Sequence, residues 1–415
     1  MSNFDDLKLA VEALSGGKNT VLFDDDLGTG GESFPSIMVR IPQFNSLNVL
    51  EGAPDSPHSM FVVDDLPLPE VYFSKYQNIV MHDRAYSLPF KDPRAYVNFD
   101  QAKQFCEAKG TGWHLATNAE YAGIALWCLK NGFMPRGNNN YGQDITAAHE
   151  KGVVTYTYTD DNGTPRKGRT ATGSGPVSWN HDGSDSGICD LNGNVWEWAG
   201  GFRVLNGEIQ IIPHNNAAKH IDQSASSTQW KAILQDGTLV APGTANTLKF
   251  DSSVAGDSTQ TNHGIGGKTI ISTTRANPMY TGGNVNDYYG YQAHTFETLE
   301  AKSGVTIPMM LKILGIAPPS TGLDGDYFWC RNYGERLPLR GGSYYGNESR
   351  AGVFALMMKF PRAFSTHDVG FRAALLSGRM YKAQGPYARA ERQKEPVSVP
   401  IGKVGKKQKP HGSCQ

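Results

Sequence analysis

The sequence predicts an α+β fold in which two amphipathic helices precede a long region of short strands and loops. The chain has 415 residues, among them 47 glycines and 23 prolines, and only 19% of its residues are charged. This composition is typical of a turn-rich protein rather than of a helical bundle. The length suffices for one large hydrophobic core or two smaller ones. We therefore expect a mixed or antiparallel β core with long loops.

Two helix signals stand close together in the first third of the chain. The first predicted helix begins after Asn98, a good N-cap residue, and ends before Gly110. The second begins at Thr117 and Glu120, which have the spacing of a capping box. In both segments the apolar residues recur at helical spacing, so each helix should bury one face. His114 lies between the two helices and is expected to be a hydrogen-bonded core histidine.

The remaining chain is expected to divide into several parts. Residues 1–70 are predicted to form a small N-terminal segment that packs on the main domain or mediates assembly. Residues 71–376 are predicted to form the main domain. Within it, residues 215–335 read as a long polar insertion with little regular pattern, apart from a broken helix near its end. Residues 377–415 are expected to form a basic C-terminal tail.

The stretch 187–203 is expected to organise the core. Its Asn-Gly-Asn sequence, ending at Asn194, predicts a tight turn. Trp196 and Trp198 follow in the alternation of a half-buried strand, and large buried rings mainly fill cores. Glu197 between them could brace neighbouring loops. A hairpin is also expected within residues 153–169.

The sequence around this strand resembles that of a known family. Residues 190–198, Asp-Leu-Asn-Gly-Asn-Val-Trp-Glu-Trp, resemble the signature of the formylglycine-generating enzyme superfamily, which has a C-type-lectin-like fold. Residues 340–343 resemble its Arg-Gly-Gly-Ser element, and residues 370–372 its closing Gly-Phe-Arg strand. The resemblance implies a structural core at Asn194, Trp196, Trp198, Arg340, Gly341, Gly342, Phe371 and Arg372.

The segment 340–372 resembles that of the variable proteins of diversity-generating retroelements. In those proteins an error-prone reverse transcriptase rewrites this segment at template adenines. Here an orderly apolar stretch, residues 350–356, separates two irregular ones. Most residues of the irregular stretches can be reached from asparagine codons by changing adenines, whereas Glu348, Met357, Met358 and Lys359 would need other template codons.

The irregular stretches are expected to form a recognition surface. Tyrosine and phenylalanine offer rigid contact area, while small polar side chains adapt their hydrogen bonds, as in antibody paratopes. The predicted ligand-binding residues are Tyr344, Tyr345, Asn347, Ser349, Met357, Lys359, Phe360, Ala363, Phe364, Ser365, Thr366, His367 and Asp368.

The resemblance implies a binding protein rather than an enzyme. We expect a receptor-binding protein of a phage tail fibre that determines host tropism, made in the bacterial cytoplasm and carried on the virion. Its partners would be a host surface protein or glycan and other tail proteins, with a homo-oligomer as an open alternative. The formal charge of −1 favours no nucleic acid, and no apolar run is long enough for membrane insertion. Placement in the bacterial cytoplasm or on the cell surface remains an alternative.

Two other functions stay open. A metal-dependent oxidoreductase of the same superfamily would need cysteines shortly after residues 340–343, and none is present there. The five cysteines are instead expected to be reduced and mostly buried. A fixed-specificity lectin would need Ca²⁺. Oxygen ligands for Ca²⁺ or Mg²⁺ are offered near residues 181–190, by His181, Asp182, Asp185 and Asp190, but a solvated loop is the simpler interpretation, and we predict no cofactor and no metal.

Overall fold

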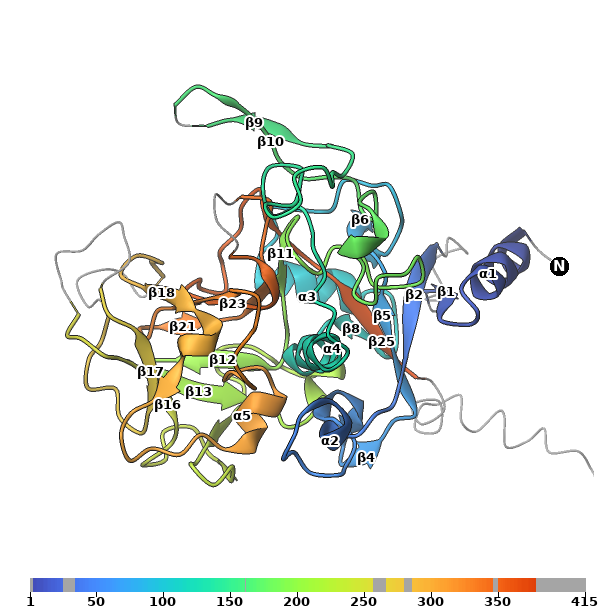
Figure 1. Cartoon of the computed structure of the whole chain (residues 1–415). Helices are drawn as coiled ribbons and strands as arrows, with labels where there is room; N and C mark the ends of the chain where they lie inside the picture. Colours follow the sequence, from blue (N-terminus) through green and yellow to red (C-terminus); the bar gives the residue numbers. More distant parts are fainter. Residues whose placement is uncertain are drawn as a thin grey trace, which may run out of the picture. The chain divides into compact units, whose positions relative to one another are not determined.

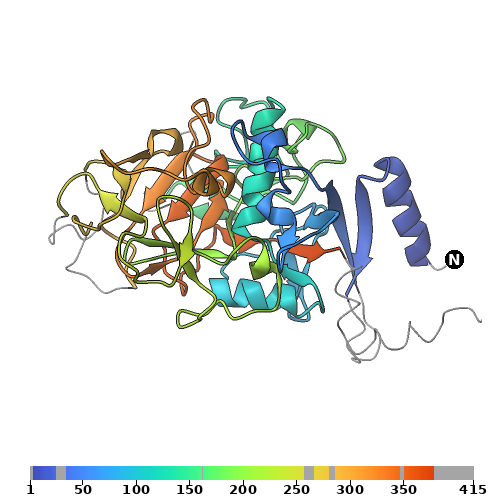
Figure 2. The same ribbon diagram turned by 90° about the horizontal axis from the view of Figure 1, so that it is seen from below.

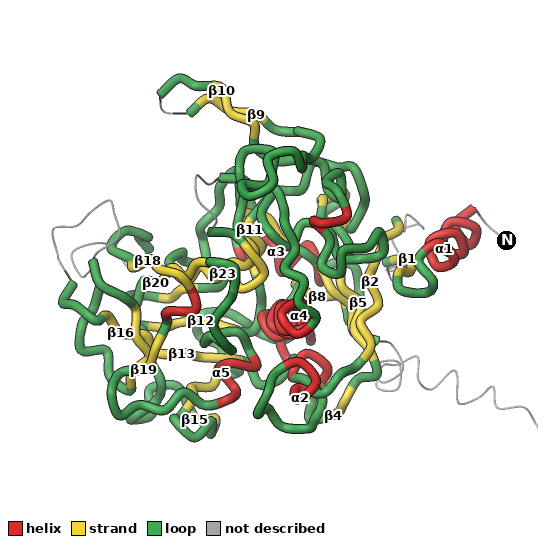
Figure 3. Tube along the Cα trace, viewed as in Figure 1, coloured by secondary structure: helices red, strands yellow, loops and turns green. Residues whose placement is uncertain are grey.

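Helices and strands are both present in the computed structural model, and strands predominate (Figures 1 and 3). The structure describes residues 3–24, 34–160, 162–256, 266–279, 286–345 and 350–377. The α-helices within these ranges are α1 Asn3–Leu14, α2 Ser46–Val49, α3 Phe99–Glu107, α4 Asn118–Lys130 and α5 Met309–Ile313. The mixed α+β class predicted from the sequence is confirmed.

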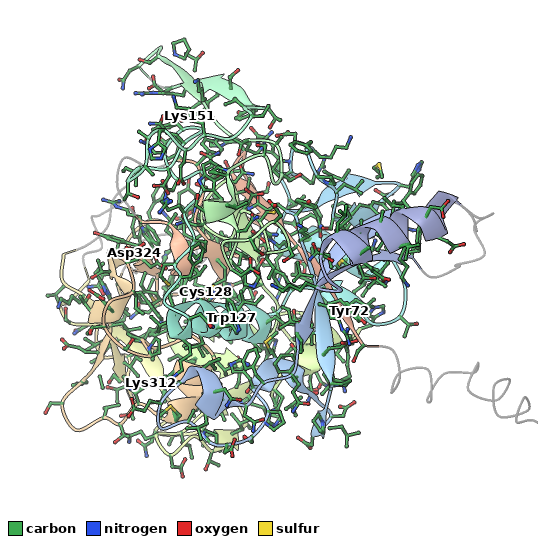
Figure 4. All side chains as sticks on the ribbon, turned by 45° about the vertical axis from the view of Figure 1, so that its right-hand side comes forward. Tyr72, Trp127, Cys128, Lys151, Lys312 and Asp324 are labelled. Carbon is green, nitrogen blue, oxygen red and sulfur yellow. The ribbon has the colours of Figure 1, made fainter. Side chains whose placement is uncertain are left out.

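Both predicted N-cap residues cap a helix in the structure. The Asn98 side chain accepts a hydrogen bond from the Gln101 backbone N–H at 2.9 Å, which fixes the start of α3. At α4, the Glu120 backbone N–H donates to the Thr117 hydroxyl, and the Thr117 N–H donates to the Glu120 carboxylate. Residues on every side of α4 are buried, so this helix is enclosed by the fold, whereas the sequence predicted that it would bury one face only. Trp127 and Cys128 of α4 are labelled in Figure 4.

His114 is the core histidine that was expected. Its Nε2 lies 2.9 Å from the Glu120 carboxylate, and its Nδ1 lies 2.9 Å from the Gly112 carbonyl. The four described cysteines are buried and free, which agrees with reduced thiols.

The three motifs of the sequence form adjacent strands. β11 (Trp196–Trp198) lies between β22 (Leu339–Gly341) and β24 (Val369–Phe371). Glu197 stands opposite Arg340 in the antiparallel pair and beside Gly370 in the parallel one. Segments far apart in the sequence therefore meet at Glu197.

An ion pair at the centre of this sheet ties it to the neighbouring loops. The Arg372 Nε donates to the Glu197 carboxylate at 2.7 Å, and both side chains are almost completely buried. The other guanidinium nitrogens donate to backbone carbonyls of two loops, at Ser74, Lys75, Cys189 and Asp190. Glu197 also accepts from the Gln77 amide and the Tyr121 hydroxyl. The carboxylate thus braces the loops around the strand, as expected.

The remaining strands of this sheet come from two sources. β23 (Gly352–Met358) pairs with β22, and its residues are all buried. It runs beyond the predicted apolar stretch, so Met357 lies in a strand and not in an irregular segment. β20 (Tyr327–Cys330) and β18 (Gln292–Thr295) complete the sheet, and both belong to the expected insertion.

The insertion is more regular than the sequence indicated. It supplies most of an eight-stranded sheet, and the expected helix at 295–314 is reduced to a 3₁₀ turn at Phe296–Thr298 and to α5, on either side of Gly304. The prediction of little regular structure in the insertion was wrong, because these strands are too short to show a hydrophobic periodicity in the sequence. The strands of this sheet are β12 Phe202–Leu205, β13 Glu208–Ile211, β14 Lys231–Ile233, β15 Leu239–Val240, β16 Lys249–Ser252, β17 Thr269–Ser272, β19 Glu300–Ala301 and β21 Glu335–Arg336.

The N-terminal residues join a five-stranded sheet. Its order is β1 (Asn19–Phe23), β2 (Pro35–Pro42), β5 (Glu70–Ser74), β25 (Ala373–Leu376) and β8 (Trp113–Leu115). Figure 2 shows α1 beside β1 at the end of this sheet. The pairing of β2 with β5 links the N-terminal segment to the predicted main domain.

Three two-stranded hairpins complete the strands. The hairpin expected within residues 153–169 is present and extends away from the sheets at the top of Figure 1. No helix in the described part of the chain has the length and apolar character that a membrane crossing requires. The hairpin strands are β3 Val62–Val63, β4 Leu66–Pro67, β6 Ile79–Met81, β7 Arg84–Tyr86, β9 Thr157–Thr159 and β10 Pro165–Lys167.

The buried carboxyl of Asp190 predicts how the free energy of unfolding depends on pH. One oxygen of this carboxyl accepts from the Gly173 N–H, and the other has no hydrogen-bond partner. Burial raises the pKa of Asp190 to about 6. Because the folded pKa exceeds the unfolded one, wild-type stability should fall as pH rises from about 4 to 6. Asp190→Asn keeps the acceptor and suits the left-handed backbone at this position.

We expect Asp190→Asn to stabilise the protein by about 1–3 kcal/mol at pH 7 and to lose this advantage by about pH 4. Urea unfolding at several pH values measures the difference. A gain that is independent of pH would contradict the assigned cause.

Candidate functional site

A cavity of about 370 Å³ lies between the two irregular stretches of the segment 340–372. Seven of the thirteen predicted ligand-binding residues line it: Tyr345, Met357, Lys359, Phe360, Phe364, Thr366 and Asp368. The fold thus gathers side chains from β23 and from the loops before and after it into one concave surface.

The cavity wall also contains residues from outside this segment. Trp196 of β11 and Trp329 of β20 meet edge to face, with ring centroids 5.4 Å apart. Asn139 and Tyr141 contribute from the long loop after α4. Sequence reasoning assigned Trp196 to the core and did not identify the other three. The Tyr327–Cys330 strand held a signal, since its aromatic residues are typical of a buried strand.

One side of the cavity is an aromatic stack. The Phe360 and Phe364 rings are parallel, with centroids 3.6 Å apart. Tyr288, from the insertion, packs against both rings at 5.3 and 5.4 Å. Aromatic packing of this kind holds the rings in fixed positions. The loop after β23 therefore offers a rigid apolar face.

The cavity also contains charged groups. The Lys359 ammonium lies 4.1 Å from the centroid of the Tyr291 ring and 4.8 Å from that of Phe360. Burial lowers the pKa of Lys359 to about 8. Burial also raises the pKa of the Asp368 carboxyl, which accepts a hydrogen bond from the Ser343 hydroxyl at 2.9 Å. Arg350 contributes a second cation to the lining.

Other predicted site residues lie elsewhere. Tyr344 was expected in a recognition surface but its side chain is fully buried, and its hydroxyl lies 2.6 Å from the His367 Nδ1. Tyr345, by contrast, is 56% exposed. Ala363 and Ser365 are exposed outside the cavity lining. Asn347 and Ser349 lie outside the described residues.

The hairpin formed by β9 and β10 extends this surface. The Tyr156 and Tyr158 rings stack on the His367 ring, with centroids 6.2 and 5.6 Å apart, and Tyr158 also lies beside Tyr345. Sequence reasoning predicted the hairpin but not this contact. The spacing of the two tyrosines, two residues apart and so on one face of a strand, was the available signal.

The predicted core residues occupy the sheet below the cavity. The Asn194 side chain is buried and bonds Asn138, Thr170 and Gln77. Gly341 and Gly342 have φ of 88° and 92°, and a Cβ at Gly342 would lie 2.2 Å from that of Ala351. Only glycine tolerates this conformation and this close approach.

No group of three or more His, Cys, Asp or Glu side chains able to hold a metal ion occurs in the described ranges. Near the residues considered for Ca²⁺ or Mg²⁺, the His181 Nδ1 accepts from the Ile188 N–H, and Asp182 accepts from Ser184. Internal hydrogen bonds therefore engage these polar groups.

Comparison with known proteins gives a structural likeness. No family model matches the chain, and no curated protein matches it. The solved structure of Treponema denticola variable protein 1 is similar over 86% of this chain and 99% of that chain, at 12% sequence identity and a TM-score of 0.30. This TM-score is too low to identify the fold.

Proposed function

We propose that this chain is a non-enzymatic binding protein whose cavity is diversified by a retroelement, built on a C-type-lectin-like domain. The observation that carries the proposal is the convergence of seven predicted ligand-binding residues on one cavity. Glycines that the backbone requires precede these residues and a buried strand lies among them, so the changing side chains stand on a constant frame.

The chemistry of the lining supports binding rather than catalysis. Stacked aromatic rings and two buried tryptophans provide rigid contact area at low entropic cost. The exposed Tyr345 and the hairpin tyrosines enlarge this area beyond the cavity. Such a surface suits a cell-surface protein or glycan, and we place it at the tip of a phage tail fibre, in contact with other tail proteins.

Deep sequencing of the codons for residues 340–372 across a population that carries this gene tests the proposal. We expect variation at Tyr345, Phe360, Phe364 and Thr366, with the codons of β23 constant. An invariant segment without a near-identical template repeat nearby would overturn diversification and would favour a fixed-specificity lectin.

Binding variants provide a second prediction. Tyr345→Ala and Phe364→Ala should each reduce retention of the labelled protein on host bacteria by about tenfold, because aromatic anchors dominate such surfaces. Phe90→Ala is the matched control, since Phe90 is exposed and lies outside the segment. Equal retention of all three variants and the wild type would exclude the cavity as the binding site.

A further inference from the structure

The cavity has a constant part as well as a variable one. Lysine and methionine codons end in a purine, whereas asparagine codons end in a pyrimidine. Adenine changes at the first two positions of an asparagine codon therefore produce neither residue. Met357 and Lys359 fall outside the set that such diversification reaches, and Trp196 and Trp329 lie outside the segment altogether.

Lys359 is the charged member of this constant part. Within the described chain its ammonium has no hydrogen bond and no carboxylate within ion-pair distance; its contacts are the faces of Tyr291 and Phe360. Lys359 is half-buried, and the Asp368 carboxyl acts on it from beyond ion-pair distance. Partial removal of a cation from water without a contacting anion is costly, and contacts with aromatic faces offset only part of that cost. An anionic group of a ligand would complete the site.

The charge of the lining indicates which anion fits. Lys359 and Arg350 are cationic, and Asp368 is the carboxyl group that also lines the cavity. Asp368 is engaged by the Ser343 hydroxyl. A lining with two cations and one carboxyl group suits a singly charged carboxylate better than a phosphate dianion. The tryptophans and the phenylalanine stack offer apolar ring faces in the same cavity, against which a ring of the ligand can pack.

We propose that the constant part of the cavity, centred on Lys359, recognises a carboxylate carried on a ring, and that the variable residues distinguish the rest of the ligand. This inference rests on the proposed function. It implies that differently diversified copies share one chemical requirement while differing in specificity. The ring can be that of an acidic sugar or of an aromatic acid, since the same contacts serve both.

Calorimetric titration at pH 7 with matched pairs of probes tests this inference. The pairs are glucuronate with glucuronamide, benzoate with benzamide, and indole-3-acetate with indole-3-acetamide. In at least one pair the carboxylate should bind the wild type about tenfold more tightly than its amide, as loss of a charge-assisted contact predicts. The pair that responds distinguishes a sugar from an aromatic acid.

Variants assign the preference to Lys359. Lys359→Met should remove the preference and retain binding of the amide, whereas Lys359→Arg should keep the preference. Lys151→Met is the control, since Lys151 is exposed and lies outside the cavity lining (Figure 4). Thermal melting of each variant shows whether it is folded.

The outcomes separate the two proposals. A preference that persists in Lys359→Met, equal binding within every pair, or no binding of any probe by the wild type would overturn the carboxylate inference. A diversified segment found by sequencing would leave the proposed function standing in each of these cases. An invariant segment together with a Lys359-dependent preference would overturn diversification instead and leave a fixed carboxylate site.

Discussion

Arg372→Met is expected to destabilise the protein by about 3–5 kcal/mol, as removal of one partner from a buried ion pair does. Arg372 is fully buried, and its guanidinium bonds Glu197 and the carbonyls of two loops. Methionine fills a similar volume but donates no hydrogen bond. The Glu197 carboxylate would then stay buried with only Gln77 and Tyr121 as donors. The free energy of urea unfolding measures the loss.

Two further variants separate charge from geometry at this site. Arg372→Lys retains the charge but cannot reach Glu197 and the four carbonyls with one ammonium, so most of the loss should remain. Adding Glu197→Gln to Arg372→Met removes the uncompensated charge and should recover part of the stability. A stability of Arg372→Met within about 1 kcal/mol of wild type would refute the central role of this pair.

Local signals in the sequence predicted local structure well. Asn98 and Thr117 begin α3 and α4 because a cap is formed by residues three apart in the chain. The alternation of Trp196 and Trp198 likewise predicted β11. In each case the residues that decide the structure are close neighbours in sequence, so that no tertiary contact has to be known.

What the sequence did not predict depends on distant contacts. The strands of the insertion span two to four residues and are held by pairing with strands elsewhere, such as β20 with β23. Trp329 reaches the cavity by that pairing, and Tyr288 of the insertion packs against Phe364. Tyr344 looks like a surface residue in its polar neighbourhood, yet the hairpin tyrosines and His367 cover it. Burial of this kind is a property of the fold and not of the segment.

The same limit applies to the candidate site. The matches at residues 340–343 and 370–372 delimited the segment, and the irregular stretches between them indicated recognition. The structure was required to tell which residues of the segment line the cavity, which support it and which lie on the outer surface. Tyr344 and Tyr345, for example, are neighbours in sequence, yet Tyr344 is fully buried and Tyr345 is 56% exposed. Alternation along an extended backbone sends adjacent side chains to opposite sides.

The two tryptophans of β11 differ in their surroundings, and Trp198 gives the second large effect. Trp198 is fully buried, and its Nε1–H donates to the Val97 carbonyl at 3.0 Å. Trp198→Ala should cost about 3–5 kcal/mol, through the lost burial and the closed void that remains. Trp196 lines the cavity, so water can fill the space left by Trp196→Ala and the cost should be smaller.

Binding should show the reverse order. Trp196→Ala removes part of the cavity wall and the edge-to-face contact with Trp329, so ligand binding should weaken even where the protein remains folded. Trp198→Phe, which keeps most of the buried ring area away from the cavity, should leave binding unchanged and is the matched control. Chemical unfolding and titration with the same probes measure both properties on each variant. Equal losses of stability for Trp196→Ala and Trp198→Ala would show that both rings serve the core alone, and the cavity would then lose one of its constant walls.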